Sequence, residues 1–473
     1  PTLATYTSFR EAYAGAHHDI YSCFVRRGLE LTAGGKVGVI SSRSFLLAPR
    51  SETFRQVDVL PHLSVLLDLG LGVMDDAYVE SAAYVLDARG SSRFCVVDAR
   101  SEAPTHESLR ILGLLRDTVK ECIASQFKDL PQQRILYTLP ERMRRLIISG
   151  RPFEPAHGTA REGMTSFDND RYLRLWWEVP PSAIGAGRYW HRLAKGGGYA
   201  FYYADLPLLL NWYRDGAELK ATNERVNGST AQVRQASSYW YHAGATYSKR
   251  SAKGFSARVL PSGYIFTSNG PAVLLNDDSD LDPAFLVAWL NSSPVRALIQ
   301  MQANFGDYST GSLKKLPWPN SLSGELSSQI TQLGRALCAE ARSRCQQSET
   351  SCVFFPSGLP RQLDLLSPHL QTELSPDSSK QEEIDRLICK AYGITDIGWA
   401  YDILQPSESE ASEEPDDENQ SVVSSGEQLL SVLLGCALGR WDVCKIAEAR
   451  ERTDKGDAFG QIPPTPVVLL EEC

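Results

Sequence analysis

The chain has 473 residues, an apolar fraction of 42% and a formal net charge of −9. This length accommodates two to four domains, and no apolar run approaches the roughly eighteen residues that a membrane-spanning helix needs. The sequence shows no signal peptide and no Cys-x-x-Cys pair among its ten cysteines, so we expect a cytoplasmic protein with reduced thiols. Cys338, Cys345 and Cys352 repeat every seven residues, but no histidine completes a ligand set and we expect no metal site there.

The first hundred residues alternate between helical and strand patterns. Apolar spacing predicts a helix at Ile20–Leu31 that ends at Gly34-Gly35, and then a short strand at Val37–Ile40 in a sheet buried on both faces. The next expected elements are a helix at 54–60 and strands at 63–69, 82–87 and 94–98. Arg89-Gly90-Ser91-Ser92 predicts a hairpin between the last two strands. The pattern indicates an α/β sheet that is completed by antiparallel strands.

The composition changes several times after this region. Between Leu404 and Leu430 there are eight acidic residues and no basic one, which predicts a linker with too little apolar content to fold. Aromatic residues, glycines and short strands dominate from Arg151 to about 320 and indicate a second domain of α+β type. The expected domains are an α/β half-domain at 1–100, a helical connector at 101–150, an α+β domain at 151–320, a helical domain at 321–403, an acidic linker at 404–427 and a C-terminal unit at 428–473. Helical spacing predicts helices at 325–346 and 381–392, and helical character again from residue 428.

The charge distribution argues for DNA binding although the net charge is negative. Between Arg188 and Arg258 there are eleven Lys or Arg residues against four Asp or Glu residues. Local charge decides a phosphate contact, because surface fields are screened within about 8–10 Å in physiological salt. The glycines at 196–198 allow a backbone to approach a ligand closely. The predicted DNA-binding residues are Lys195, Gly197, Lys249, Arg250, Lys253 and Arg258.

Residues 19–86 follow a characteristic order. Asp19-Ile20-Tyr21 begins the first helix, Ser44-Phe45-Leu46 follows the first strand, and Val73-Met74-Asp75-Asp76 follows the second strand. Glu80-Ser81-Ala82-Ala83 then begins the next strand. This order resembles the second half of the catalytic domain of adenine-specific (N6) DNA methyltransferases, which has a Rossmann-like sheet. The resemblance implies that Ser44, Phe45 and Met74 belong to the pocket for the target adenine, with Met74 at a position where the family has Phe, and that Asp19 and Tyr21 pack beside the cofactor.

Two motifs of that family are not found in this sequence. There is no Asn/Asp/Ser-Pro-Pro-Tyr/Phe catalytic loop, and Gly34-Gly35-Lys36 lies between a helix and a strand, so it predicts a turn and not a cofactor loop. We therefore expect no catalytic residue here. The resemblance implies that the amino-terminal half of the catalytic domain is missing from this chain, is a partner of it, and binds most of the cofactor S-adenosylmethionine.

The region from Tyr189 to Pro319 resembles the target-recognition region of methyltransferases from phage-resistance systems of the BREX and DISARM type. The resemblance rests on Ala194–Tyr199, Tyr202–Leu206, Phe266–Ala272 and Leu313–Pro319. It implies double-stranded DNA as substrate, methylation that marks host DNA as self, and other subunits of the defence system as further partners. Two alternatives stay open: a non-catalytic DNA-binding or specificity subunit, and a part of a fused restriction–modification enzyme.

Overall fold

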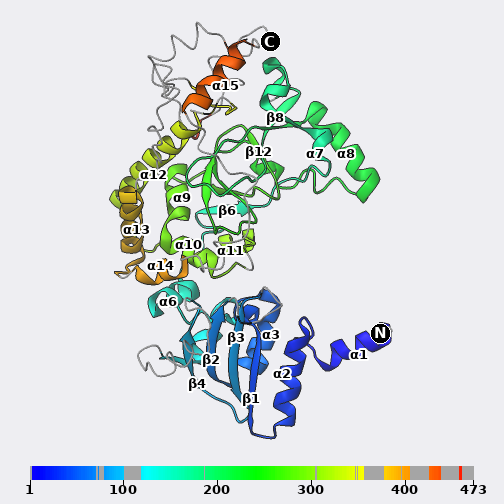
Figure 1. Ribbon diagram of the computed structural model, residues 1–473, viewed down its shortest axis with the longest axis vertical. Helices are drawn as coiled ribbons and strands as arrows, with labels where there is room; N and C mark the ends of the chain where they lie inside the picture. Colours follow the sequence, from blue (N-terminus) through cyan, green and yellow to red (C-terminus); the bar gives the residue numbers. More distant parts are fainter. Residues whose placement is uncertain are drawn as a thin grey trace. The chain divides into compact units, whose positions relative to one another are not determined.

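The computed structural model describes residues 3–70, 73, 79–100, 119–185, 187–303, 306–346, 348, 350–355, 378–395, 397–404, 425–437, 441 and 458–460 (Figure 1). The chain divides into two compact units. Unit 1 comprises Pro1–Gly150, Met301–Phe305 and Tyr401–Glu414; unit 2 comprises Arg151–Gln300, Gly306–Ala400 and Pro415–Cys473. Among the described residues no helix is both long enough and apolar enough to span a membrane.

Unit 1 is built on a five-stranded sheet with the strand order β1-β3-β2-β4-β5. Its strands are β1 (Lys36–Ser42), β2 (Leu63–Gly70), β3 (Ser81–Asp87), β4 (Arg93–Asp98) and β5 (Val119–Ile123). Strand β3 is antiparallel to both β1 and β2, β4 is parallel to β2, and β5 is antiparallel to β4. The described helices of unit 1 include α1 (Leu3–Ala12), α2 (Ile20–Leu31), the 3₁₀-helix η1 (Arg43–Leu46), α3 (Glu52–Phe54), the short π-helix η3 (Arg55–Val59), α5 (Ser125–Lys128) and α6 (Glu141–Ser149).

The predicted hairpin between β3 and β4 is wrong, because β2 lies between these two strands. The connection after β3 passes the start of β2, where the Asp87 amide donates to the His62 carbonyl and the Ser91 amide donates to the Pro61 carbonyl, both at 2.7 Å. The turn residues predicted a reversal of the chain correctly. The turn residues do not indicate which strand lies between β3 and β4 in the sheet.

Burial on both faces is also wrong for the described residues of this sheet, and the expected helical connector contains a strand beside its helices α5 and α6. In β1 the residues Lys36, Gly38 and Ile40 are exposed, and in β4 buried residues alternate with exposed ones from Arg93 to Val96. One face of each strand is therefore covered and the other is open. The expected connector contributes β5, whose pattern Val-Lys-Glu-Cys-Ile buries only Cys122 and so lacked the apolar run that would have indicated a strand.

Unit 2 contains two four-stranded sheets. One has the order β11-β10-β13-β6 and the other has the order β12-β8-β9-β7, in which β12 is parallel to β8 and the remaining pairs are antiparallel. These strands are β6 (Gly158–Arg161), β7 (Leu173–Leu175), β8 (Trp190–Ala194), β9 (Leu208–Asn211), β10 (Gly244–Tyr247), β11 (Ala257–Leu260), β12 (Tyr264–Phe266) and β13 (Ala272–Leu275). The described α-helices that follow α6 in the chain are α7 (Asn169–Tyr172), α8 (Tyr213–Asn227), α9 (Pro283–Asn291), α10 (Ser293–Gln300), α11 (Thr310–Lys314), α12 (Gly324–Cys345), α13 (Ser378–Tyr392), α14 (Gly398–Leu404) and α15 (Ser425–Ala437).

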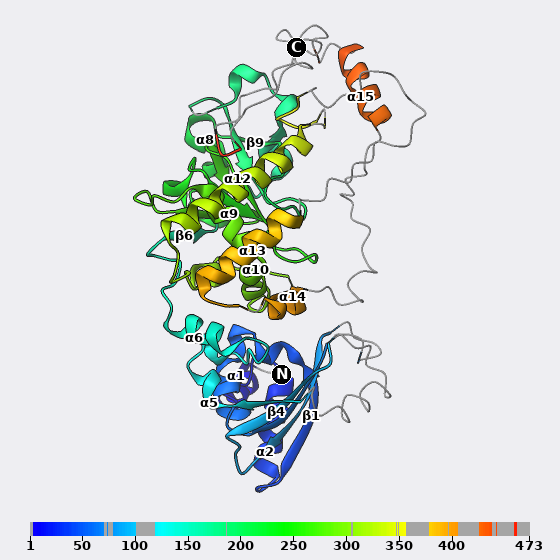
Figure 2. The ribbon, with the colours of Figure 1, turned by 90° about the vertical axis from the view of Figure 1, so that its left-hand side faces the viewer.

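Helix α9 lies between the first of these sheets and helix α12, and α13 lies beside α12 (Figures 1 and 2). Every residue of α9 after Pro283 is buried. A Cβ at Gly334 of α12 would lie 2.6 Å from the Ala284 carbonyl oxygen, so glycine permits the close crossing. The helices expected at 325–346 and 381–392 are confirmed as α12 and α13, and α15 confirms helical character after residue 428. Most of the expected acidic linker, 405–424, lies outside the described residues.

Candidate functional site

A network of charged groups occupies the edge of the unit 1 sheet where β1, β2 and β4 end. Arg43, the residue after β1, donates from Nε and Nη2 to the two carboxylate oxygens of Asp68 on β2, at 2.7 and 2.8 Å. Its Nη1 also donates to Glu80 at 3.1 Å. Asp68 is fully buried. Its carboxylate therefore depends on Arg43 to compensate for the water that it has lost.

Residues from other elements extend this network. The Tyr137 hydroxyl donates to Asp68 Oδ2 at 2.7 Å, and burial, followed by the Asp68 charge, raises the pKa of Tyr137 well above its ordinary value. Arg100 pairs with Asp98 at the end of β4 at 2.6 Å and lies 3.8 Å from Asp68. The sequence interpretation missed this network. Arg43, Asp68 and Asp98 are each a charged residue at or next to the end of an apolar strand. This repetition is the sequence signal that could have indicated the network.

The residues predicted for the adenine pocket are only partly available to a ligand. Phe45 has 0% of its surface exposed, and its ring packs 4.7 Å from the Tyr84 ring and 6.1 Å from the Phe54 ring. The structure thus places Phe45 in the core. Ser44 is half-buried, and its amide donates to the Ser42 hydroxyl at the start of η1. Met74 lies outside the described residues.

Asp19 and Tyr21 lie at the start of α2, close to Ser44. Asp19 forms an ion pair with Arg50 at 3.2 Å, and the Tyr21 ring meets the edge of the Phe54 ring at 6.2 Å. Burial raises the pKa of Tyr21, and the neighbouring Ser44 side chain partly opposes this shift. The Tyr21 hydroxyl is buried and makes no hydrogen bond within the described part of the chain, and Asp19 Oδ2 is buried with the Arg50 ion pair as its contact. This corner of unit 1 therefore has unused capacity for a polar ligand.

Hydrogen bonds from Arg258 hold the glycine loop at 196–198 of unit 2 in place. Gly196 and Gly197 have φ angles of 95° and 141°, which only glycine adopts readily. The Arg258 guanidinium donates to the Gly198 carbonyl at 2.7 Å and to the Ser248 hydroxyl at 3.1 Å, and Ser248 in turn donates to the Gly197 carbonyl. Because Arg258 is 1% exposed, it supports the loop and is not on the surface, where the sequence interpretation had expected it.

Three of the predicted phosphate ligands lie on a second loop, next to the glycine loop. The Lys249 amide donates to the Asn269 carbonyl, and the same carbonyl would contact a Cβ at Gly196 at 2.9 Å, so both loops touch one segment. Lys249 Nζ pairs with Glu162 at 2.8 Å. The side chain of Arg250 is 83% exposed and lies 3.7 Å from Asp307, and Lys253 is also exposed. The structure brings Lys195, Gly197, Lys249, Arg250 and Lys253 together on two adjacent loops.

The structure shows where the three cysteines with seven-residue spacing lie and what one of them contacts. Cys338 and Cys345 are on α12, whereas Cys352 lies beyond its end. The Cys352 thiol donates to Asp205 Oδ1 at 2.7 Å, and burial raises the pKa of both groups. Within the described residues no group of His, Cys, Asp and Glu side chains could hold a metal ion.

Comparison of the sequence with known proteins gives two curated relatives. Adenine-specific methyltransferase PglX of Lacticaseibacillus casei (strain Zhang) is 24% identical over 312 residues, which cover 60% of this chain. Adenine-specific methyltransferase BrxX of Escherichia coli O9:H4 (strain HS) is 27% identical over 259 residues, which cover 52% of this chain. The chain is similar to adenine-specific methyltransferases. This finding confirms the resemblance inferred from the sequence.

The matches cover only a part of these relatives, namely 24% of the PglX length and 20% of the BrxX length. No protein-family model matches the chain. Among solved structures, the Type IIL restriction–modification enzyme MmeI in complex with DNA has a TM-score of 0.48 and 13% identity, with 84% of this chain and 53% of that chain covered. The ATP-dependent Type ISP restriction–modification enzyme LlaBIII bound to DNA has a TM-score of 0.34 and 11% identity, with 66% and 26% covered.

Proposed function

We propose that this chain supplies target recognition and part of the adenine pocket to an S-adenosylmethionine-dependent DNA methyltransferase. The enzyme would methylate adenine N6 at a short sequence and mark host DNA as self in a phage-resistance system of the BREX or DISARM type. The observation that carries the proposal is the similarity to two adenine-specific methyltransferases over more than half of the chain. Unit 1 would be the second half of the catalytic domain, and residues 151–320 of unit 2 would form the recognition domain.

Two adjacent loops of unit 2 are the part of the described chain best suited to DNA. The glycine loop and the Lys249–Lys253 loop combine exposed cations with backbone that a ligand can approach closely. Cations of this kind would neutralise phosphates, while amide and hydroxyl groups would contact sugars or base edges. Arg258 would act on DNA indirectly, because its guanidinium holds the glycine loop in place.

The start of α2 fits one side of a site for S-adenosylmethionine. The Tyr21 hydroxyl, which makes no hydrogen bond within the described part of the chain, and the Asp19 carboxylate are suitable partners for a polar cofactor, but these two residues are too few to form the whole site. The cofactor would supply the methyl group. Asp19 and Tyr21 would only help to hold it, and no step of the transfer is assigned to residues of this chain.

A further segment of the same catalytic domain would cover the open side of unit 1. The α2 residues Ile20, Phe24 and Leu31 are 67–72% exposed and share one face of the helix, and β1 is an edge strand of its sheet with Ile40 exposed. An apolar stripe next to an unpaired strand edge is a surface that proteins normally cover. We therefore place the join to the cofactor-binding half at α2 and β1.

The test is a methylation assay on double-stranded DNA with labelled S-adenosylmethionine. The full chain is assayed alone and together with the amino-terminal half of a related methyltransferase. Label on adenine N6 in the combined sample would support the proposal. Sequence-dependent DNA binding without label in either sample would instead favour a non-catalytic specificity subunit. Phe24→Ser should abolish labelling in the combined sample while DNA binding by the chain alone stays unchanged, because Phe24 lies in unit 1 and is exposed.

A further inference from the structure

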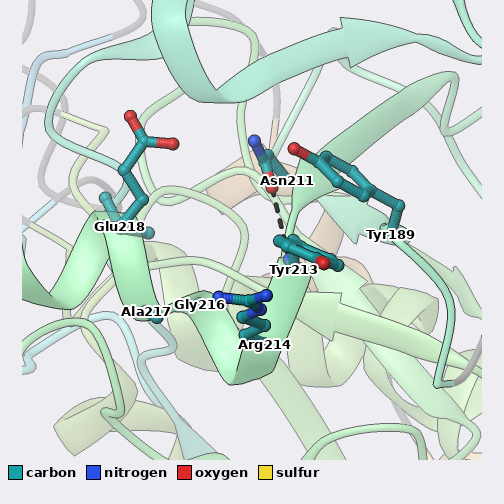
Figure 3. Close-up of a pocket in the computed structure, with 8 residues that line it drawn as sticks. Tyr189, Asn211, Tyr213, Arg214, Gly216, Ala217 and Glu218 are labelled. Carbon is teal, nitrogen blue, oxygen red and sulfur yellow. Dashed lines mark hydrogen bonds between the residues drawn. The ribbon is translucent and has the colours of Figure 1, made fainter.

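A small hollow in unit 2 combines two aromatic rings with several polar groups. Tyr189, Asn211, Tyr213, Arg214 and Glu218 are among its lining residues, and its volume is about 180 Å³. The Tyr189 and Tyr213 rings stack with their centroids 4.5 Å apart and their planes inclined by 17° (Figure 3). The guanidinium of Arg214 lies 5.1 Å from the Tyr213 ring centroid. None of these residues is on the two loops that were assigned to phosphate binding.

The backbone that positions these side chains is strained. Arg214, Asp215 and Gly216 have consecutive φ angles of 51°, 58° and 67° at the start of α8, in the left-handed region that non-glycine residues rarely occupy. A Cβ at Gly216 would lie 2.6 Å from the Trp212 ring, which fixes glycine there. Strain of this kind persists only where the surroundings enforce it, and such positions are common at ligand sites.

Two tyrosine rings and one cation of this hollow are accessible to a ligand. Tyr189 is 40% exposed and Tyr213 is 45% exposed, although each presents a large apolar ring to water. Arg214 contacts the Tyr213 ring and makes no ion pair within the described part of the chain. Asn211 uses its carbonyl oxygen to accept the Tyr213 amide at 3.2 Å, which leaves its NH₂ group available for a ligand.

We propose that this hollow binds a nucleobase of the DNA substrate. The inference rests on the proposed function and adds a base contact to it. A nucleobase has a π face for the outer face of the Tyr189 ring, which Tyr213 supports from the other side, and an edge with both donors and acceptors, and the hollow offers both kinds of partner. Asn211 and Arg214 donate, and Glu218, which Arg171 holds by an ion pair, accepts.

A phosphate group fits this hollow less well than a base. Glu218 would place a carboxylate beside the phosphate, and the stacked rings would contribute little to binding it. The base can come from an intact duplex, where its edge is read in a groove, or from an unpaired nucleotide, whose face is free to stack. The same side chains serve both sources, so the experiment has to separate them.

The test measures the affinity of the full chain for three labelled DNAs by fluorescence anisotropy. These are a duplex of mixed sequence, the same duplex with one unpaired base, and a single strand. Tyr213→Leu removes the ring, Tyr213→Phe removes only the hydroxyl, and Arg214→Gly removes the guanidinium while relieving the left-handed strain. Trp177→Leu, which removes another ring that is 40% exposed in unit 2, is the matched control.

We expect about a tenfold loss of affinity for Tyr213→Leu and a smaller loss for Tyr213→Phe, the usual order when stacking dominates. Arg214→Gly should weaken binding while its melting temperature stays equal or rises, which a purely structural role would not produce. A loss confined to the single strand and the duplex with one unpaired base identifies an unpaired base, whereas a loss confined to the two duplexes identifies a base edge that is read in a groove. Wild-type affinity in all variants would overturn the inference alone, whereas a wild-type chain that binds no DNA would overturn the proposed function as well.

Discussion

Each unit has an inward-facing arginine next to a segment that we propose to approach DNA. In unit 1 this is Arg43, which precedes Ser44, and in unit 2 it is Arg258, which contacts the glycine loop at 196–198. The two arginines are stabilised differently. In unit 1, burial works against the charge of Arg43, yet the carboxylates of Asp68 and Glu80 raise its pKa. In unit 2, Arg258 donates hydrogen bonds to two neutral acceptors, the Gly198 carbonyl and the Ser248 hydroxyl. The first arrangement is an ion-pair network and the second is a brace for a loop.

This difference has a consequence for the effect of mutations. An ion pair in a buried network leaves an uncompensated charge when one partner is removed, so it should dominate the stability of unit 1. Hydrogen bonds to backbone carbonyls contribute less each, but they fix the position of the atoms that they bind. Arg258 should therefore matter more for DNA binding than for stability.

The largest expected effect is that of Asp68→Asn. The substitution keeps the shape of the side chain but leaves Arg43 with Glu80 as its remaining close carboxylate, so unit 1 should lose about 3–5 kcal/mol of stability. Urea unfolding followed by circular dichroism measures this loss. Glu121→Gln is the control, since that side chain belongs to an ion pair of the same sheet and is 59% exposed. Equal losses in the two variants would show that the Asp68 network is not special.

Replacing Arg258 by Met should have a smaller effect on stability and a clear effect on DNA binding. The Gly198 carbonyl and the Ser248 hydroxyl lose a donor, which should cost unit 2 about 1–3 kcal/mol. The glycine loop should then lose its fixed position, and DNA affinity should fall in an anisotropy titration performed well below the melting temperature. Arg386→Met, on the exposed side of α13, is the control. DNA affinity equal to that of this control would contradict the role of Arg258 as a brace.

Arg250→Ala should leave stability almost unchanged, because its ion pair with Asp307 is long and exposed. If Arg250 contacts a phosphate, the slope of log K against log salt should decrease in magnitude by about 0.9. Affinity measured at several salt concentrations gives this slope. Arg386→Ala should leave it unchanged. An unaltered slope in Arg250→Ala would remove Arg250 from the interface.

The smallest expected effect concerns pH and belongs to unit 2. Burial, assisted by Arg151, lowers the pKa of His157, whose ring stacks on Trp318 at 4.4 Å. The unfolded chain then binds a proton more readily than the folded one, so this contribution to stability is complete above about pH 6.5 and decreases as the pH falls. Melting temperatures between about pH 7 and pH 5 should decline less steeply in His157→Phe. The same decline in both proteins would exclude His157 as the cause.

Local patterns were sufficient for single elements and for the family resemblance. Helical spacing placed α2 at Ile20–Leu31 as the structure has it, and it located α12 and α13 to within a few residues. The order of short motifs in residues 19–86 indicated the methyltransferase resemblance, which the curated relatives confirm. The resemblance to adenine-specific methyltransferases and the basic, aromatic character of residues 188–258 could thus be recognised from the sequence without coordinates.

The tertiary structure decided what the individual side chains do. Phe45 and Arg258 have residue types that suit a site, but both are buried, and the sequence does not record how neighbouring elements cover them. The insertion of β2 between β3 and β4, and the meeting of Arg43 with Asp68, depend on pairing between strands that are distant in sequence. Helical periodicity is a property of a few consecutive residues, whereas strand order and burial are properties of the whole packed unit, so only the first can be read along the chain.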